Sequence, residues 1–346
     1  MEKDTLILVT GASGFIGAKL VKALLEQGYR VRGTVRSISN MEKYKYLTDL
    51  SQDRLELVEG DLMKEDGWEN AVDGCDTVMH VASPLPASFP KDENEIIAPA
   101  VNGVKYVLNA CVKKKIRKVV LTSSVVAIYP GNRPDKLIYT EEDFAVENNT
   151  DYYNKSKLLA EKEAWKIYEQ NNKCFQLSVI CPALVIGPAI NTSTCYASGI
   201  LPMMLLKGRM YSCPRFKIGI VHVDDVVKAH ISAMEKNSTN GKRYIISNKP
   251  VWIKELAAIL SEKYTPRGYS LPKSEMWYFT FYIASFFNRA LWSFNEIWGK
   301  DLEFINTKSI QELGIDYISV KDAAYDHSEW LLEHGMVKRS SKDQEQ

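Results

Sequence analysis

Residues 5–17 read Thr-Leu-Ile-Leu-Val-Thr-Gly-Ala-Ser-Gly-Phe-Ile-Gly, and this stretch decides the fold. The apolar residues 6–9 predict a buried strand that runs directly into a turn. In that turn Gly11 permits the tight path from strand to helix, Gly14 lets backbone N–H groups approach a pyrophosphate, and Gly17 lets the helix pack closely on the sheet. An amphipathic helix and a second strand at 29–35 follow, so we predict a dinucleotide-binding unit.

Strand and helix patterns alternate along the first half of the chain. Apolar runs predict strands, and the stretches between them predict helices: strands at 55–59, 75–81, 118–123 and 176–181, and helices at 39–50, 93–113 and 153–170. Strands separated by helices are typical of an α/β fold, here a Rossmann-type doubly wound parallel sheet. Ligands of such sheets bind at the carboxyl ends of the strands.

The alternating pattern loosens after Pro182. We expect residues 1–182, joined again by 221–248, to form a dinucleotide-binding domain. Residues 183–220 and 249–335 are expected to form a smaller, partly discontinuous C-terminal lobe that binds the substrate. The polar residues 338–346 predict a disordered tail.

The composition is that of an ordinary soluble protein. Hydrophobic residues make up 45% and charged residues 25%, and the net charge of +1 gives no reason to expect a nucleic-acid partner. No secretory leader fits before the first strand. The six cysteines lack metal-binding spacing, so we expect buried thiols, no metal and a cytoplasmic location.

An aromatic segment at 276–292 is the one stretch that suggests a membrane. It is short for a membrane span, and Asn288 and Arg289 interrupt it. We therefore expect a buried or lid-forming helix without membrane contact, with a helix lying in the membrane interface as the alternative.

Seven further motifs follow the glycine turn in order. They are Gly33-Thr-Val-Arg36, Gly60-Asp-Leu62, His80-Val-Ala-Ser-Pro84, Leu121-Thr-Ser-Ser124, Tyr153-x-x-x-Lys157, Cys181-Pro-Ala-Leu-Val-Ile-Gly-Pro188 and Val221-His-Val-Asp-Asp225. Together these motifs resemble the extended short-chain dehydrogenase/reductases, and within them the dihydroflavonol reductase and cinnamoyl-CoA reductase group. The matches cover about two-thirds of the chain, and the resemblance is faint beyond residue 235.

The resemblance implies three catalytic residues. Tyr153 and Lys157 are four positions apart and so share one face of a helix. Tyr153 would protonate a carbonyl oxygen as hydride arrives at the carbon, and the ammonium of Lys157 would lower the pKa of the phenol and bind the nicotinamide ribose. Ser124, at the end of a strand, would hold the substrate oxygen near Tyr153.

Each of these roles has a rival in the sequence. Ser123 competes with Ser124, and adjacent strand residues point to opposite faces, so only one can serve. Tyr152 is followed four positions later by serine rather than lysine. Many family members carry an asparagine three residues before a helix glycine, where this chain has Ala100; Asn102 is the alternative.

The end of the second strand predicts NADP(H) as the cofactor. A carboxylate there would favour NAD, whereas Arg36 suits the 2′-phosphate of NADP, with Arg32 as a rival. The resemblance adds Lys43 as a second phosphate contact. The full set of expected cofactor contacts is Gly11, Ser13, Gly14, Phe15, Ile16, Gly17, Arg36, Lys43, Asp61, Leu62, Val81, Ala82, Ser83, Tyr153, Lys157, Pro182 and Val185.

The expected substrate is a hydrophobic or aromatic ketone or aldehyde. Its contacts would come from Pro84, Ser124, Tyr129 and Tyr153, from residues 190–220 and from aromatic residues such as Trp277 or Phe281. Tyr129 stands where dihydroflavonol reductases carry asparagine, and Thr150–Asn154 departs from the cinnamoyl-CoA reductase motif, so neither named substrate follows. The alternatives are a 3β-hydroxysteroid dehydrogenase, a sugar-nucleotide epimerase and an NADP(H)-sensing binding protein. We expect a monomer or homodimer.

Overall fold

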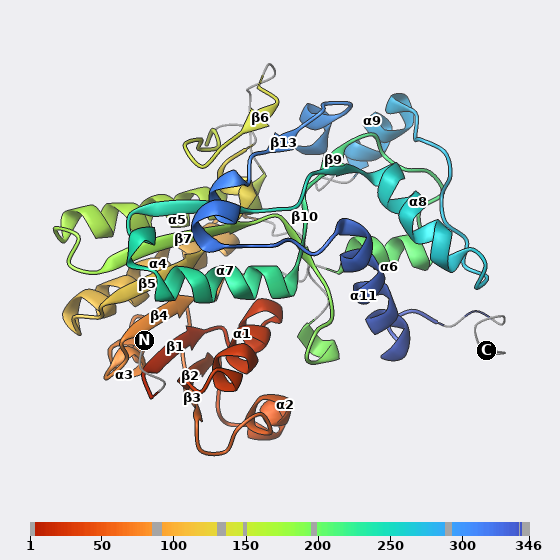
Figure 1. Cartoon of the computed structure of the whole chain (residues 1–346). Helices are drawn as coiled ribbons and strands as arrows, with labels where there is room; N and C mark the ends of the chain where they lie inside the picture. The colour runs from red at the N-terminus through yellow and green to blue at the C-terminus, as the bar shows by residue number, and fades with distance from the viewer. Residues whose placement is uncertain are drawn as a thin grey trace.

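The computed structural model describes residues 4–84, 92–129, 136–147, 151–194, 199–287, 293–338 and 340. A sheet of seven parallel strands forms its centre, in the order β11-β7-β5-β4-β1-β2-β3 (Figure 1). The strands are β1 (Leu6–Thr10), β2 (Arg30–Val35), β3 (Leu55–Glu59), β4 (Thr77–His80), β5 (Lys118–Thr122), β7 (Gln176–Pro182) and β11 (Lys242–Ile246). The predicted Rossmann-type doubly wound sheet is therefore confirmed.

The order in which successive strands are added to the sheet reverses between β1 and β4. From β1 it runs outward to β2 and β3, and then returns to place β4 on the other side of β1. Val9 pairs with Gly33 of β2, while Thr10 pairs with His80 of β4. A reversal of this kind leaves a crevice outside the carboxyl ends of the central strands, where ligands bind.

Helices cover both faces of the sheet, and alternate strand residues face each layer. Leu8 belongs to the core shared with α3 (Trp68–Val72), α4 (Asn94–Lys113) and α5 (Tyr152–Gln170). Ile7 and Val9 belong to the core shared with α1 (Phe15–Glu26) and α7 (Val223–Glu235). This two-sided burial explains the continuous apolar runs of the central strands.

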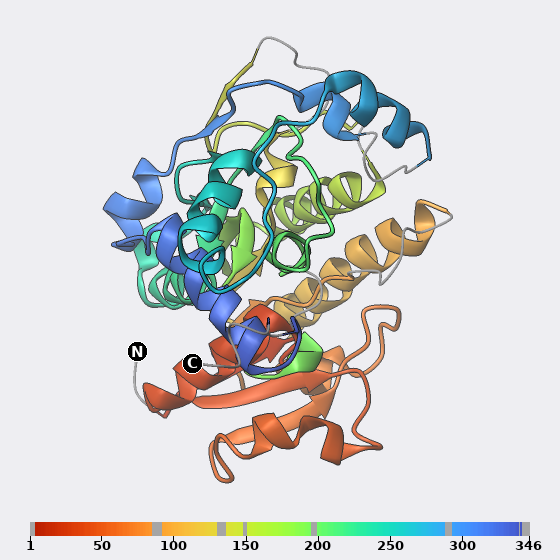
Figure 2. The same cartoon turned by 90° about the vertical axis from the view of Figure 1, so that its right-hand side faces the viewer.

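The later part of the chain adds helices beside the carboxyl ends of the strands. These are α6 (Ile200–Leu206), α8 (Ile253–Tyr264), α9 (Tyr278–Phe287) and α11 (Val320–Glu333). Figures 1 and 2 show them grouped to one side of the sheet. Three small strand pairs accompany them: β10 (Ile220–His222) with β8 (Leu184–Ile186), β12 (Val251–Trp252) with β9 (Lys217–Ile218), and β13 (Glu303–Phe304) with β6 (Ile138–Tyr139).

Some predicted elements differ from the structure. The helix expected at 39–50 is a 3₁₀ turn, η1 (Met41–Tyr44), followed by the short helix α2 (Lys45–Thr48). The strand expected at 75–81 is shorter, and β11 was not predicted as a strand. Cys174 is exposed, which corrects the expectation of uniformly buried thiols, while Cys75, Cys111, Cys181 and Cys213 are buried.

The aromatic helix α9 is neither fully buried nor long. Phe281 is buried against Phe216 and Trp298, whereas Phe279 is 71% exposed, and Trp277, directly before the helix, is 81% exposed. Within the described ranges, no helix has both the length and the apolar character needed to cross a membrane.

Candidate active site

The glycine turn joins β1 to α1 by a close approach of backbones. Gly11 has a φ of +66°, and a Cβ at this position would lie 2.9 Å from the Cα of Ala82, so both the conformation and the space require glycine. A Cβ on Gly17 would clash with the carbonyl oxygen of Gly11. The sequence therefore folds here into a turn that brings backbone N–H groups to the sheet crevice.

The N-terminus of α1 is free of side-chain caps. Gly14 is the N-cap residue and makes no side-chain cap hydrogen bond, and the first turn contains no acidic residue. Unpaired N–H groups and the helix dipole at such an end favour an anion. Phe15 and Ile16 begin this helix, and the carbonyl oxygen of Ser13 accepts a hydrogen bond from the Tyr46 hydroxyl at 3.1 Å.

Two exposed cations follow the neighbouring strand. The hydroxyl of Thr34 accepts a hydrogen bond from the Gly11 N–H at 3.1 Å, and this bond holds the end of β2 against the turn. Arg36 lies two residues later and is exposed, as is Lys43 in η1. The rival Arg32 is occupied, because its Nε donates to Glu56 at 2.9 Å. Of the three basic residues considered for the 2′-phosphate, Arg36 and Lys43 are thus the exposed ones.

The remaining expected dinucleotide contacts line the same edge of the sheet. Asp61 and Leu62 follow β3; the Asp61 carboxylate accepts from the N–H of Met63 at 2.9 Å. Residues 81–83 follow β4, and the Ala82 N–H donates to the Thr10 hydroxyl at 3.0 Å. Pro182 ends β7, and Val185 lies buried in β8. The fold brings Asp61, residues 81–83 and Pro182 to the carboxyl ends of strands of the central sheet, whereas Val185 lies in the small strand pair of β8 and β10.

Ser124, Tyr153 and Lys157 meet where β5 ends and α5 begins. The carboxylate of Asp151 caps α5 by accepting from the Asn154 N–H at 2.9 Å, which fixes the first turn that carries Tyr153. Lys157 is one turn further, with its Nζ 5.9 Å from the centre of the Tyr153 ring. The Ser124 hydroxyl donates to the carbonyl oxygen of Pro182 at 3.4 Å.

Burial sets the ionisation of this group. It raises the pKa of Tyr153 to about 12, with Asp151 adding to the rise and the Ser124 hydroxyl opposing it. Burial also lowers the pKa of Lys157 to about 8, against the attraction of Cys181 and Glu161. In this structure, the pKa of Tyr153 therefore lies above its usual value rather than below it, because the phenol is buried.

The residues expected to contact the substrate lie further apart than the three expected catalytic residues. Tyr129 packs in an aromatic group with Tyr139 and Phe304, at ring distances of 5.8 and 5.2 Å. Pro84 is half-buried after β4. Phe281 lies in the packed core described above and Trp277 points to solvent, so the structure does not bring these two aromatic residues to one surface.

Comparisons with known proteins agree with this geometry. The model of the NAD dependent epimerase/dehydratase family matches residues 7–247. The chain belongs to this family. It is 35% identical over 342 residues to tetraketide alpha-pyrone reductase 1 of Arabidopsis thaliana, covering 96% of both chains. It is 38% identical over 268 residues to dihydroflavonol 4-reductase of Dianthus caryophyllus, covering 75% of this chain and 73% of the relative.

Solved structures extend the agreement to the whole fold. Yeast methylglyoxal/isovaleraldehyde reductase Gre2, solved in complex with NADPH, superposes with a TM-score of 0.80 at 26% identity, covering 96% of this chain and 100% of that one. Vestitone reductase from alfalfa superposes with a TM-score of 0.75 at 28% identity, covering 95% and 99%. Within the epimerase/dehydratase family, the chain is an oxidoreductase of the extended short-chain type.

The sequence reasoning missed a buried charge cluster beside Lys157. Glu161, one turn further along α5, is 1% exposed and receives Nε of Arg243 at 2.5 Å. It also accepts from the Ser123 hydroxyl at 2.5 Å and from the Trp165 indole at 3.1 Å. The four-residue spacing of Lys157 and Glu161 was a visible signal, whereas the partner Arg243 lies on β11, which the sequence pattern did not reveal.

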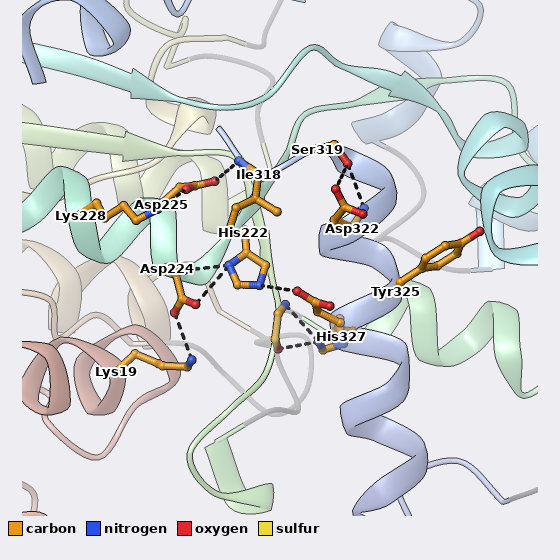
Figure 3. Close-up of polar contacts among 12 residues, drawn as sticks. Lys19, His222, Asp224, Asp225, Lys228, Ile318, Ser319, Asp322, Tyr325 and His327 are labelled. Carbon is orange, nitrogen blue, oxygen red and sulfur yellow. Dashed lines mark hydrogen bonds and ion pairs between the residues drawn. The ribbon is translucent and has the colours of Figure 1, made fainter. Parts of the chain in front are cut away.

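A second missed feature joins α1 and the start of α7 to α11. Figure 3 shows His222, of the Val221–Asp225 motif, with Asp224 on one side and α11 on the other. The His222 Nδ1 accepts from the Asp224 N–H at 3.1 Å, and its Nε2 lies 3.7 Å from Asp326 of α11. Asp224 in turn pairs with Lys19 of α1 at 3.0 Å. The motif therefore ties the helix that follows the glycine turn to the last helix of the chain.

Proposed function

We propose that the protein is an NADPH-dependent reductase of ketones or aldehydes carried on hydrophobic or aromatic small molecules. The observation that carries the proposal is the meeting of Ser124, Tyr153 and Lys157 at the same sheet edge as the glycine turn. Relatives named cinnamoyl-CoA reductase and dihydroflavonol 4-reductase support the substrate class.

The cofactor is NADP(H), and the chain has the groups to hold it. The N-terminus of α1 suits the pyrophosphate, because no side chain caps it and its first turn carries no acidic residue. Arg36 and Lys43 are exposed beside the turn and carry the positive charge that a 2′-phosphate needs. The NADPH complex of the Gre2 relative supports the same choice.

Each catalytic residue has a separate task in this proposal. When bound, NADPH supplies the hydride that reaches the carbonyl carbon. Tyr153 donates its phenolic proton to the carbonyl oxygen, and its pKa of about 12 keeps that proton in place at neutral pH. Ser124 orients the same oxygen by a hydrogen bond, and the Lys157 ammonium binds the ribose and stabilises the phenolate left on Tyr153.

Oxidation of NADPH across a panel of carbonyl compounds tests the proposal. The panel comprises aromatic aldehydes, α-diketones, β-keto esters, dihydroflavonols and ketosteroids, with NADPH absorbance as the readout. Tyr153→Phe should lower kcat by about 10²- to 10⁴-fold while NADPH still binds. Tyr152→Phe removes the neighbouring hydroxyl and serves as the matched control, with kcat near that of the wild type.

Other outcomes would point to other functions. Turnover confined to ketosteroids would favour a hydroxysteroid dehydrogenase, and conversion of a sugar nucleotide without net NADPH loss would favour an epimerase. NADPH binding without turnover of any compound would favour a sensor. Full activity of Tyr153→Phe would contradict the assigned acid.

A further inference from the structure

A small cavity borders Lys157 on the side of the sheet. Its volume is about 20 Å³, and its wall includes His80, Ala100, Ser123, Lys157 and Glu161. A space of this size with several polar walls has the dimensions of a site for one water molecule. Within the described ranges, the Lys157 ammonium makes no hydrogen bond to another protein group, although Lys157 is only 8% exposed.

The carboxylate of Glu161 lines this cavity and is held by several hydrogen bonds. Arg243 binds both of its oxygens, at 2.5 and 3.2 Å, and the Ser123 hydroxyl and the Trp165 indole each bind one. Arg243 is itself fixed, because its Nη1 donates to the carbonyl oxygens of Glu141 and Asp143. Four donors therefore leave the carboxylate little freedom to turn.

We propose that Glu161 is a positioning residue for Lys157, and that its anchored carboxylate holds the ammonium toward Tyr153 through a water in this cavity. The inference rests on the proposed reductase function. Because α5 repeats every 3.6 residues, Tyr153, Lys157 and Glu161 follow one another along one face of the helix. Tyr153 thus precedes Lys157 by about one turn, and Glu161 follows it by about one turn.

The residues on α4 that border the cavity cannot take this part. Ala100 and Val104 contribute only apolar groups, and Asn102 is not among the lining residues. His80 is committed to the Thr10 hydroxyl through Nδ1 at 2.8 Å, and burial with the nearby Lys157 lowers its pKa to about 3, so it is neutral at physiological pH. Glu161 is therefore the cavity's source of negative charge for an ammonium.

The proposal has a consequence for pH dependence. The titratable groups facing Lys157 are Tyr153 and Glu161 on α5, His80 on β4 and Cys181 on β7, with Arg243 of β11 behind Glu161. Burial lowers the pKa of Lys157 to about 8, and Glu161 opposes that lowering. Without the carboxylate, Lys157 should lose its proton at a lower pH. The enzyme should then lose its activity at that lower pH as well.

The test compares Glu161→Gln and Glu161→Asp with the wild type in pH profiles of kcat/KM. Glu161→Gln should lower kcat by roughly 10- to 100-fold with little change in the KM of the carbonyl compound. It should also move the alkaline limb to lower pH by about one unit. Glu161→Asp keeps the charge, so its limb should stay near that of the wild type. Glu163→Gln, which removes a carboxylate paired with Lys166 on the same helix, is the control and should change neither.

Direct titration of Lys157 separates this proposal from the reductase assignment. Carbon-13 NMR of lysine-labelled protein, with Lys157→Met to assign the signal, follows the ammonium without any turnover. An unshifted Lys157 titration in Glu161→Gln overturns the proposal, whether or not the wild type reduces a compound. If Glu161→Gln does not fold, Ser123→Ala decides, because it removes one anchor and leaves the charge. A lower kcat at unchanged NADPH affinity supports the proposal, and an unchanged kcat overturns it.

Discussion

Ser123 and Ser124 are neighbours in sequence but direct their hydroxyls to different partners. Ser123 donates to the buried carboxylate of Glu161 at 2.5 Å, and Ser124 donates to the carbonyl oxygen of Pro182 at 3.4 Å. The bond of Ser123 is short and charged, whereas that of Ser124 is long and easily exchanged. The Ser124 hydroxyl, which also accepts from the Val126 N–H at 3.3 Å, is therefore the one that we expect to turn toward a substrate oxygen.

Replacing each serine by alanine should give unequal losses. Ser124→Ala removes a donor aimed at the reacting oxygen, so we expect kcat to fall by about 10²-fold with NADPH affinity unchanged. Ser123→Ala should cost less in kcat, because it acts only through Glu161. Steady-state kinetics with the best carbonyl compound of the panel, together with NADPH titration by fluorescence, measure both effects. A larger loss in Ser123→Ala than in Ser124→Ala would reverse the assignment of the two serines.

The sequence was sufficient for the elements whose pattern is local. The strand predicted at 55–59 has the bounds of β3, and the predicted helices at 93–113 and 153–170 begin within one residue of α4 and α5. In these segments, apolar residues repeat with the period of the element. The glycine turn was equally readable, because Gly11 and Gly17 satisfy steric demands that only glycine can meet.

The parts that the sequence did not reveal depend on distant partners. The strand β11 begins with Lys242 and Arg243, which do not mark a buried strand, and Arg243 is buried only because Glu161 lies opposite it. The broken helix at 41–48 and the contact of His222 with α11 likewise follow from tertiary packing. The roles of Ser124, Tyr153, Arg36 and the other site residues stay predictions, although the fold brings most of them to one sheet edge.

Cofactor preference provides a second prediction. Arg36→Asp replaces the exposed cation after β2 by a carboxylate, which repels a 2′-phosphate and accepts hydrogen bonds from ribose hydroxyls. We expect kcat/KM with NADPH to fall by about 10- to 100-fold and kcat/KM with NADH to stay or rise. Arg30→Asp makes the same change at the exposed opposite end of β2 and should alter neither value. Equal use of both cofactors by the wild type would contradict the role of Arg36.

The histidines provide a third prediction, which concerns stability in acid. Four of the five, His80, His222, His230 and His327, are buried, and burial lowers the pKa of each, to about 3 for His80 and about 4 for His230. Below pH 6.5 the unfolded chain takes up protons at these positions more readily than the native protein does. The free energy of unfolding should therefore fall as pH falls from 6.5 toward 4, by about 1.4 kcal/mol per pH unit for each of His80 and His230, and His222 and His327 act in the same direction.

His230→Gln isolates one share of this acid sensitivity. The ring of His230 bonds the Val226 carbonyl and the Thr122 hydroxyl, so the variant should be less stable than the wild type at pH 7. Between pH 6.5 and 4, the free energy of unfolding of the variant should nevertheless fall less steeply than that of the wild type. The difference between the two slopes should be about 1.4 kcal/mol per pH unit. The raised pKa values of Asp225 and Glu141 work in the opposite direction, but they are common to both proteins and cancel in the comparison.

Urea unfolding followed by tryptophan fluorescence at several pH values measures the two slopes, with His334→Gln at an exposed position as the control. Parallel slopes for the wild type and His230→Gln would show that His230 is protonated in the native protein as readily as in the unfolded chain.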